Sequence, residues 1–387
     1  MIADLFNRKE KKVEYVELIY DLIFVYIIGR NNQLLHNFEG GFVDFKTLFA
    51  YALCTLAVIQ IWSYTTFYIN IFGRNSVRNY VFMFINMYLL YFIGESTRAD
   101  NWQAFQAQYQ IAWGLILLNI ALQYLLELRN HRGETFAKSL VRRMCTALFT
   151  QALIVFIAAF CQPKISLIIA FFAVIVGIVL SSAGRQSFPE NPIDFSHLTE
   201  RIMLFVVLTF GEMIVVLASY FNGDGSWEWN RIYISLMAFL IVVGLFLTYG
   251  LCYDYLIDRE STRNALPYMV VHIFIIFALN IITASLEYMR EQGVALMPKI
   301  IMLVSSIVSY FLLLLLLARY DKVNSKPTVK FFVLLGALSV AFVVLMLLLR
   351  EYMYINIFIS VAYVFGVFLL YVLSYRKLIK NTQANEK

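Results

Sequence analysis

The sequence predicts an all-α protein that crosses a membrane many times. Of its 387 residues, 61% are hydrophobic and only 14% are Asp, Glu, Lys or Arg, whereas soluble domains have about 25% charged residues. Apolar stretches long enough to cross a hydrocarbon core of about 30 Å recur along the chain. They lack the two-residue alternation of barrel strands, so helices are expected. These observations exclude a cytosolic enzyme, a disordered chain and a secreted disulfide scaffold.

Twelve apolar stretches predict about twelve transmembrane helices. Their approximate spans are 15–36, 46–71, 77–97, 102–127, 140–161, 164–183, 196–220, 230–257, 265–289, 297–318, 328–349 and 352–375. The first stretch follows a basic segment, as in a signal peptide. It contains Glu17 and Asp21 and lacks a small-residue cleavage site, so we expect a retained helix.

The distribution of basic residues predicts the orientation. Loops on the cytoplasmic side of a membrane are enriched in Lys and Arg. Of the 31 Lys and Arg residues, 22 fall in the two tails and the loops on the side of the N-terminus, 7 fall in the opposite loops, and Arg30 and Arg201 lie within helices. We therefore expect both termini in the cytoplasm.

A repeated motif predicts two halves. The segment from Tyr64 to Asn79 resembles the segment from Tyr249 to Asn264 at an offset of 185 residues, with two tyrosines, two arginines, a serine and an asparagine in common. An even number of helices in each half predicts parallel repeats related by an axis along the membrane normal. The predicted parts are an N-terminal tail (1–14), a first six-helix repeat (15–184), a linker (185–195), a second six-helix repeat (196–376) and a C-terminal tail (377–387).

Charged residues within the first and seventh predicted helices are candidates for a functional site, because each is costly in lipid. Glu17 and Asp21 are four residues apart, so they share a helix face. For Glu17, capping of a helix N-terminus is an alternative interpretation. The seventh helix has His197, Glu200 and Arg201 near its start and Glu212 further along. All four are also candidate site residues.

Arg201 and Glu212 share a helix face, about 16 Å apart, and each needs a partner elsewhere. The first helix has complementary charges, with acids near one end and Arg30 near the other. The sequence therefore predicts that Glu17 or Asp21 pairs with Arg201, and that Arg30 pairs with Glu212.

Asp254 and His272 complete the candidate set. His272 fits either an interhelical hydrogen bond or a protonation site. The five acids expected to lie deep exceed the two buried arginines by three, and lipid does not tolerate three uncompensated charges. A proton or cation site open to the cytoplasm is therefore expected.

Other chemistries have less support. His197 and Glu200 have a spacing that metal ligands can use, but no second pair matches it, so no metal and no cofactor are expected. Cys54, Cys145, Cys161 and Cys252 are expected to be core residues. Motifs for nucleotide binding or hydrolysis are missing, which argues against an enzyme. The net charge of +6 is too small an excess to predict nucleic-acid binding.

Two strings resemble the signatures of the bacterial low temperature requirement protein A family. One is Val16-Glu17-Leu-Ile-Tyr-Asp21-Leu-Ile-Phe-Val25, and the other is His197-Leu-Thr-Glu200-Arg201 followed by Gly211-Glu212. His272 also resembles a recurring family position. The resemblance implies a multi-pass protein of the bacterial plasma membrane, linked by name to growth in the cold, with no settled substrate. The segment Gly29-Arg30-Asn31-Asn32 departs from the family pattern, so no role is carried over to it.

Two functions fit these features. The first is a secondary transporter or permease-like protein with a proton- or cation-sensitive intramembrane site, acting on a proton, a cation or a small solute. The second is a non-transporting sensor or scaffold of the membrane that serves stress adaptation. The lipid bilayer is the one partner expected in both cases, and the sequence leaves the oligomeric state open.

Overall fold

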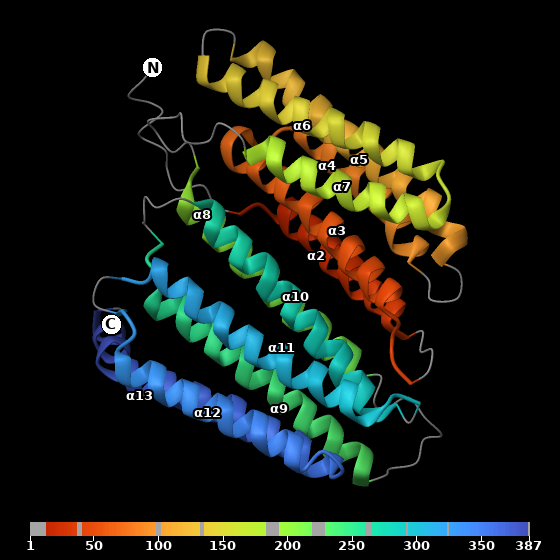
Figure 1. Cartoon of the computed structure of the whole chain (residues 1–387). Helices are drawn as coiled ribbons and strands as arrows, with labels where there is room; N and C mark the ends of the chain where they lie inside the picture. The colour runs from red at the N-terminus through yellow and green to blue at the C-terminus, as the bar shows by residue number, and fades with distance from the viewer. Residues whose placement is uncertain are drawn as a thin grey trace. The chain divides into compact units, whose positions relative to one another are not determined.

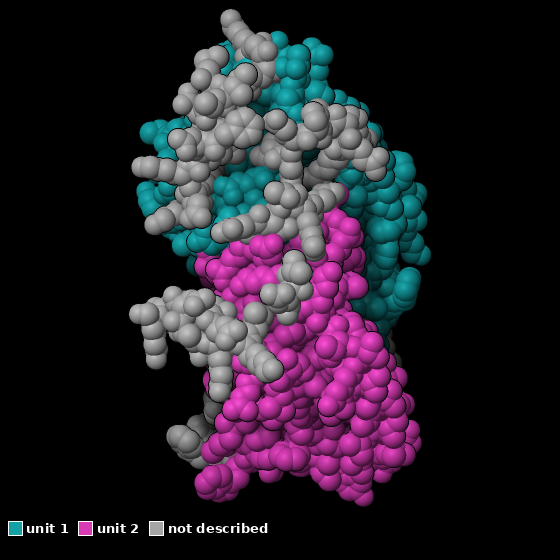
Figure 2. All heavy atoms as spheres, turned by 90° about the vertical axis from the view of Figure 1, so that its left-hand side faces the viewer, with its two compact units in different colours: residues 1–201 teal, residues 202–387 magenta. Residues whose placement is uncertain are grey.

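The computed structural model of the chain is all-α in the residues that it describes, which are 13–36, 41–97, 102–131, 135–182, 193–218, 229–259, 265–291, 293–322 and 325–385 (Figure 1). Residues 185–192 of the predicted linker (185–195), the basic segment 1–12 and part of the second repeat motif (260–264) lie outside these residues. The chain divides into two compact units, residues 1–201 (unit 1) and 202–387 (unit 2), coloured separately in Figure 2.

Unit 1 contains six complete helices and the start of a seventh among its described residues. They are α2 (Tyr15–Asn31), α3 (Phe45–Phe72), α4 (Val77–Ser96), α5 (Trp102–Asn130), α6 (Thr135–Ala159), α7 (Pro163–Ser182) and the first residues of α8 (Phe195–Ala218). A 3₁₀ turn, η1 (Asn32–His36), follows α2 directly, so the first predicted span is helical throughout. Helices α4, α5, α6 and α7 pack as successive neighbours, and α2 packs against both α3 and α4.

Unit 2 contains the rest of α8 and five further helices in its described part. These are α9 (Trp229–Leu251), α10 (Ala265–Arg290), α11 (Leu296–Leu317), α12 (Val329–Leu348) and α13 (Met353–Asn385). A π-helical turn, η5 (Cys252–Leu256), extends α9, and a 3₁₀ turn, η6 (Ala318–Tyr320), extends α11. Within unit 2, α13 packs against α9 and α12, and α10 packs against α11. Helix α13 continues to residue 385, so most of the predicted C-terminal tail is helical.

Ten of the described helices are long and apolar enough to cross a membrane by length and composition. The two that do not qualify are α2, which has only 17 residues, and α4. The protein is therefore a polytopic membrane protein, with ten candidate spans in its described residues where the sequence predicted twelve. Both remaining helices expose large apolar side chains, among them Leu22 on α2 and Phe84 on α4.

Side-chain caps start several helices. Asp44 accepts a hydrogen bond from the backbone N–H of Thr47 at 2.9 Å and begins α3, and Asp194 accepts one from the backbone N–H of His197 at 3.0 Å and begins α8. Such caps satisfy N–H groups that have no partner within the helix. The cap at Asp194 fixes where α8 starts, and it thereby sets which residues of its first turns face α2 and α3.

The core of unit 1 is rich in hydrogen-bonded polar side chains. Gln151 donates to the Gln60 carbonyl oxygen at 2.6 Å, Gln60 donates to the Tyr64 hydroxyl at 2.9 Å, and Tyr64 donates back to Gln151 at 3.0 Å. This closed triangle joins α3 to α6. Helix α7 covers it at Gly177, where an added Cβ would lie 2.2 Å from the Gln151 side-chain oxygen. Only glycine permits this close approach.

Candidate functional site

Four ionisable side chains from α2 and α8 converge in the core of unit 1. Glu17 and Asp21 lie one helical turn apart on α2, and His197 and Arg201 lie one turn apart on α8. A spacing of four residues places each pair on one helix face. Their relative exposures are 4%, 0%, 1% and 0%, respectively. We call these four residues the charge cluster.

Arg201 is the centre of the charge cluster. Its Nη2 lies 2.9 Å from Asp21 Oδ1, and its Nε lies 3.2 Å from Asp21 Oδ2, so the two side chains form a two-point ion pair. Its Nη1 lies 3.3 Å from Glu17 Oε2. Two parallel N–H···O bonds fix the orientation of both groups as well as their separation. The predicted pairing of Arg201 with the acids of the first helix is confirmed.

A third helix, α3, contributes Trp62 to the surroundings of the cluster. The indole N–H of Trp62 donates to Asp21 Oδ1 at 2.7 Å, and the Arg201 guanidinium carbon lies 5.9 Å from the Trp62 ring centre. Trp62 is itself 1% exposed. Asp21 therefore accepts three hydrogen bonds from charged or polar donors, which is the environment that a buried carboxylate requires.

His197 completes the cluster beside Glu17. Its Nε2 lies 3.5 Å from Glu17 Oε2, and its Nδ1 lies 3.1 Å from Asn70 Nδ2 on α3. The four side chains of the cluster thus comprise two carboxylates, one guanidinium and one imidazole. The predicted proton or cation site at these residues stays a prediction.

The remaining candidate acids behave differently. Asp254 was expected to lie deep, but its side chain is 62% exposed and it pairs with Arg259 at 3.2 Å. Asp254 therefore lies at the surface, on the π-helical turn that extends α9, and its expected depth in the membrane stays a prediction. Glu200 and Glu212 are both partly exposed. Glu200 forms no ion pair with a described residue of unit 1, and Glu212 forms none with a described residue of unit 2.

His272 lies in the core of unit 2. It is 1% exposed, and its ring packs against Tyr268 and Tyr249 at centroid distances of 4.3 and 6.0 Å. Its Nδ1 lies 2.8 Å from the Tyr268 carbonyl oxygen, one turn earlier on α10. Because a carbonyl only accepts, Nδ1 must have the hydrogen. This bond is within one helix, whereas the sequence favoured either an interhelical bond or a protonation site.

Arg30 has a partner that the sequence analysis did not name. Its Nη2 lies 3.8 Å from Glu95 Oε1 on α4, and both side chains are about one-quarter exposed. A partly exposed pair at this distance contributes little to stability. Glu212 lies in unit 2, so the pairing of Arg30 with Glu212 stays a prediction.

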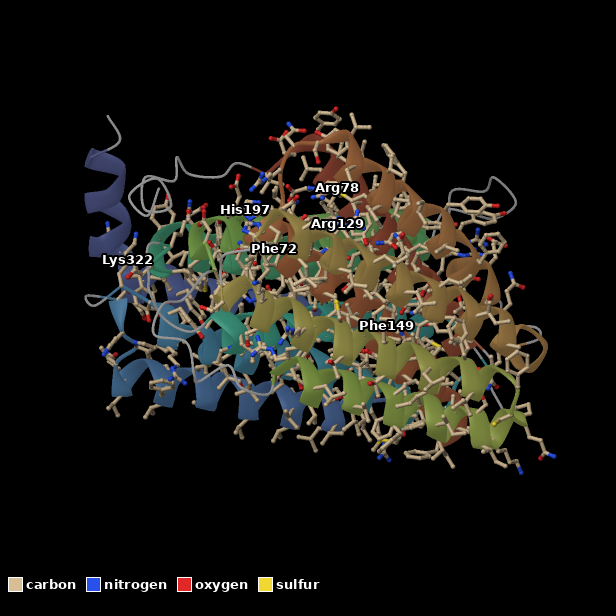
Figure 3. All side chains as sticks on the ribbon, turned by 90° about the horizontal axis from the view of Figure 1, so that it is seen from above. Phe72, Arg78, Arg129, Phe149, His197 and Lys322 are labelled. Atoms are coloured by element: carbon tan, nitrogen blue, oxygen red, sulfur yellow. The ribbon has the colours of Figure 1, made fainter. Side chains whose placement is uncertain are left out.

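Sequence reasoning also missed a third buried carboxylate in unit 1, that of Glu127. The Glu127 side chain is 1% exposed and forms an ion pair with Arg78 at the start of α4. It also accepts a hydrogen bond from the Tyr68 hydroxyl at 2.9 Å and lies 3.6 Å from His131. Figure 3 labels Arg78 and His197, which lie toward the same end of unit 1. Glu127 ends a predicted span, so its position gave no signal of burial.

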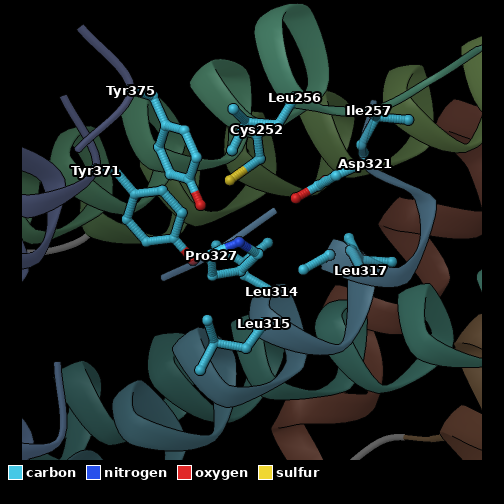
Figure 4. A pocket seen from close by; sticks show the side chains of 11 residues that line it. Cys252, Leu256, Ile257, Leu314, Leu315, Leu317, Asp321, Pro327, Tyr371 and Tyr375 are labelled. Atoms are coloured by element: carbon cyan, nitrogen blue, oxygen red, sulfur yellow. The ribbon is translucent and has the colours of Figure 1, made fainter. Parts of the chain in front are cut away.

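Unit 2 has a small pocket at the end of α9, α11 and α13 (Figure 4). The hydroxyls of Tyr371 and Tyr375, the thiol of Cys252 and the carboxylate of Asp321 point toward its centre. The free volume is about 10 Å³, which is enough for one water molecule. The pocket therefore has no room for an organic solute. Within the described residues, no group of three or more His, Cys, Asp or Glu side chains is placed to hold a metal ion.

Comparison with known proteins gives one match. The family model described as bacterial low temperature requirement A protein (LtrA) matches residues 12–370, which include the whole charge cluster. Searches of curated proteins and of solved structures returned no match. The match covers nearly the whole chain, and it agrees with the two signature strings on α2 and α8. This polytopic membrane protein therefore belongs to the bacterial low temperature requirement A family.

Proposed function

We propose that this protein is a secondary transporter or permease-like protein whose proton- or cation-sensitive site is the charge cluster of unit 1. The observation that carries the proposal is the convergence of two carboxylates, a guanidinium and an imidazole, all on side chains that are at most 5% exposed. A change in the net charge of a buried site is costly. Uptake or release of a proton or cation at this site therefore changes the energy of the surrounding helices.

The placement of the cluster on three helices supports a coupling role. Glu17 and Asp21 belong to α2, Trp62 to α3 and Arg201 to α8. A change in the charge of the site therefore alters contacts among all three helices. Coupling of this kind requires an element with two arrangements that the bound ion distinguishes.

The proposal includes a membrane topology. Twelve spans, with α2 and α4 added to the ten candidates, are supported by the apolar side chains that these two helices expose. The excess of Lys and Arg on one set of loops supports cytoplasmic termini in a bacterial plasma membrane. Two parallel six-helix repeats are supported by the shared tyrosine and arginine motif. We further propose that the protein is not an enzyme.

Flux measurement in proteoliposomes tests the proposal. Purified protein is reconstituted, a gradient of protons, alkali cations or small organic solutes is imposed, and transport is followed for wild type, Glu17→Gln and Glu95→Gln. Glu17→Gln removes one of the two buried carboxylates of the site, so we expect loss of proton- or cation-dependent flux. Glu95→Gln changes the exposed pair with Arg30 and is the matched control, which keeps its flux. No flux by wild type under any of these gradients would refute the proposal.

A second candidate is a non-transporting sensor or scaffold of the membrane that serves growth at low temperature. The observation that favours it is the tight bonding of Asp21 to both Arg201 and Trp62, which is typical of a structural ion pair. Under this function, Glu17→Gln combined with Arg201→Gln would keep growth in the cold as long as the protein still folds. A transporter that uses the site would lose it.

A further inference from the structure

The end of unit 1 at which α5 finishes and α6 begins is strongly basic. Between residues 128 and 143 the sequence has one acid, Glu134, and five basic residues, which are Arg129, Arg132, Lys138, Arg142 and Arg143. Arg132 and Glu134 lie outside the described residues. Both helices are candidate membrane spans, so these charges lie at the ends of two spans. Long basic side chains at such ends extend toward the lipid headgroups.

The packing of α5 against α6 brings the basic residues together. The Cys145 thiol on α6 donates to the Ala121 carbonyl oxygen on α5 at 3.6 Å, and residues 131–134 connect the two helices. The helices are therefore antiparallel, with these two residues both about three turns from the connection. Lys138 and Arg142 are four residues apart on α6, so they share a helix face.

The start of α4 meets the same end of α5. Arg78 forms an ion pair with Glu127, and the Asn79 amide donates to the Arg74 carbonyl oxygen at 2.8 Å. These contacts add Arg74, in the turn before α4, to the basic residues of this end. Within the described part of α4, α5 and α6, Glu127 is the acid at this end, and its charge is matched by Arg78.

Four basic side chains remain for an external ligand. Three of them are exposed and Lys138 is partly exposed, and none forms an ion pair with a residue that the structure describes. We call these four residues the basic end of unit 1: Arg74, Arg129, Lys138 and Arg142.

An exposed apolar face continues from the basic end. On α6, exposed side chains follow Arg142 at intervals of seven, four and four residues, which places them on one helix face. They are Phe149 (labelled in Figure 3), Leu153 and Ile157. The last of them lies about 22 Å from Arg142 along the axis, since a helix rises about 1.5 Å per residue. On α5, the exposed Leu122 and Leu115 follow Arg129 in the same direction.

This arrangement matches the two parts of an anionic phospholipid. Guanidinium groups bind phosphate oxygens with paired hydrogen bonds, and the apolar face is long enough to cover acyl chains in one leaflet, which is about 15 Å thick. A role in topology alone requires Lys and Arg in the loops. Lys138 and Arg142 lie within α6 instead, the latter about 10 Å along the axis from its first residue.

We propose that the basic end of unit 1 binds the headgroup of an anionic phospholipid, whose acyl chains lie along the exposed face of α6. The bound lipid joins the ends of α4, α5 and α6 through one negatively charged group. The inference goes beyond the proposed function, because it requires these helices to lie in a membrane but does not require transport.

Native mass spectrometry of the purified full chain tests the inference. Phosphatidylglycerol and phosphatidylcholine both have a phosphate but differ in net charge, and each is titrated onto the protein in detergent. We expect wild type to prefer phosphatidylglycerol. Each Lys or Arg near an anionic surface contributes about 1 kcal/mol, which is about a fivefold change in affinity. Arg129→Gln combined with Arg142→Gln should therefore bind phosphatidylglycerol about 25-fold more weakly.

Two further variants separate the site from a general effect of charge. Lys46→Gln combined with Lys164→Gln removes two exposed lysines at the starts of α3 and α7, away from the basic end, and should keep the preference. Arg129→Lys combined with Arg142→Lys retains the charge and should also keep it.

Three results would overturn the inference. The first is equal binding of the two lipids by wild type, which decides the matter even if no variant folds. The second is an equal loss of affinity in the Lys46→Gln/Lys164→Gln control. The third is displacement of phosphatidylglycerol by inorganic phosphate, which would indicate an anion site without a lipid. Absence of flux by wild type would refute the proposed function and leave this inference in place.

Discussion

Replacing Arg201 with glutamine is expected to destabilise unit 1 more than any other single change in the charge cluster. The substitution leaves Glu17 and Asp21 as two buried carboxylates, with exposures of 4% and 0%, and no guanidinium between them. Breaking a buried pair by removing one partner costs about 3–5 kcal/mol, because the remaining charge is uncompensated. In domains of 150–250 residues, about 1 kcal/mol corresponds to about 2–4 °C in Tm.

The matched variants separate the effect of charge from that of lost contacts. Asp21→Asn leaves one carboxylate and one guanidinium, so the cluster becomes balanced, although the two-point contact at 2.9 and 3.2 Å is weakened. Glu17→Gln is also balanced and changes only one contact of 3.3 Å with Arg201. We therefore expect the loss of stability to increase from Glu17→Gln to Asp21→Asn to Arg201→Gln.

The double variant Asp21→Asn/Arg201→Gln has one carboxylate and no guanidinium, which is the wild-type net charge. We expect it to be more stable than Arg201→Gln alone by at least about 1 kcal/mol, since directly paired residues show interaction energies of about 0.5–3 kcal/mol. Thermal unfolding of purified protein in detergent, monitored by size-exclusion chromatography, gives the Tm of each variant. An Arg201→Gln protein with wild-type Tm, or additive effects in the double variant, would refute the assignment of these contacts.

Three further changes test other parts of the structure. Gly177→Ala places a Cβ 2.2 Å from the Gln151 oxygen and should cost about 1–3 kcal/mol of stability by overpacking. Gly366→Ala, with nothing within 4 Å of its Cβ, is the control and should keep the wild-type Tm. Equal losses of Tm in the two variants would contradict the packing at Gly177. Glu127→Gln removes a charged acceptor of several hydrogen bonds and should lower stability by about 1.5–3 kcal/mol, visible as a lower Tm. Asp44→Ala should cost about 0.5–2 kcal/mol as the loss of a helix cap. Hydrogen bonds from the hydroxyl and backbone N–H of its partner Thr47 lower the pKa of the Asp44 carboxyl. The difference in stability between Asp44→Ala and wild type is therefore fully present above the unfolded-state pKa and disappears as the pH falls through the lowered folded-state pKa. Thermal unfolding across that pH range measures this difference.

The sequence predicted the charge cluster in part. The i,i+4 spacing of Glu17 and Asp21, and the need of a buried Arg201 for a partner, were sufficient to predict their pairing. The spacing of residues on one helix is known from the helix geometry alone. The roles of Trp62 and Asn70 were not predicted, because a neutral side chain in an apolar segment shows no sign of the group that it contacts.

Burial of the acids was the part that sequence position predicted least well. Asp254 lies within a predicted span, but its side chain, on the π-helical turn that follows Leu251, is exposed and pairs with Arg259. Glu127 lies at the end of a predicted span but is buried by the Arg78 and Tyr68 side chains. Which way an ionisable residue points depends on the helices packed against it, and the hydropathy of its own segment does not include that information.

The sequence by itself determined that the chain is an all-α membrane protein, because an apolar segment in lipid must satisfy its own backbone hydrogen bonds and the helix is the way for a single segment to do so. Its length and composition therefore sufficed for the architecture. Only the tertiary structure decided that His197 joins the predicted pairing of Arg201 with Glu17 and Asp21, and which donor directs its hydrogen at which acceptor. Those relations join residues about 180 positions apart, and their energies depend on distances of a few ångströms that no local pattern specifies.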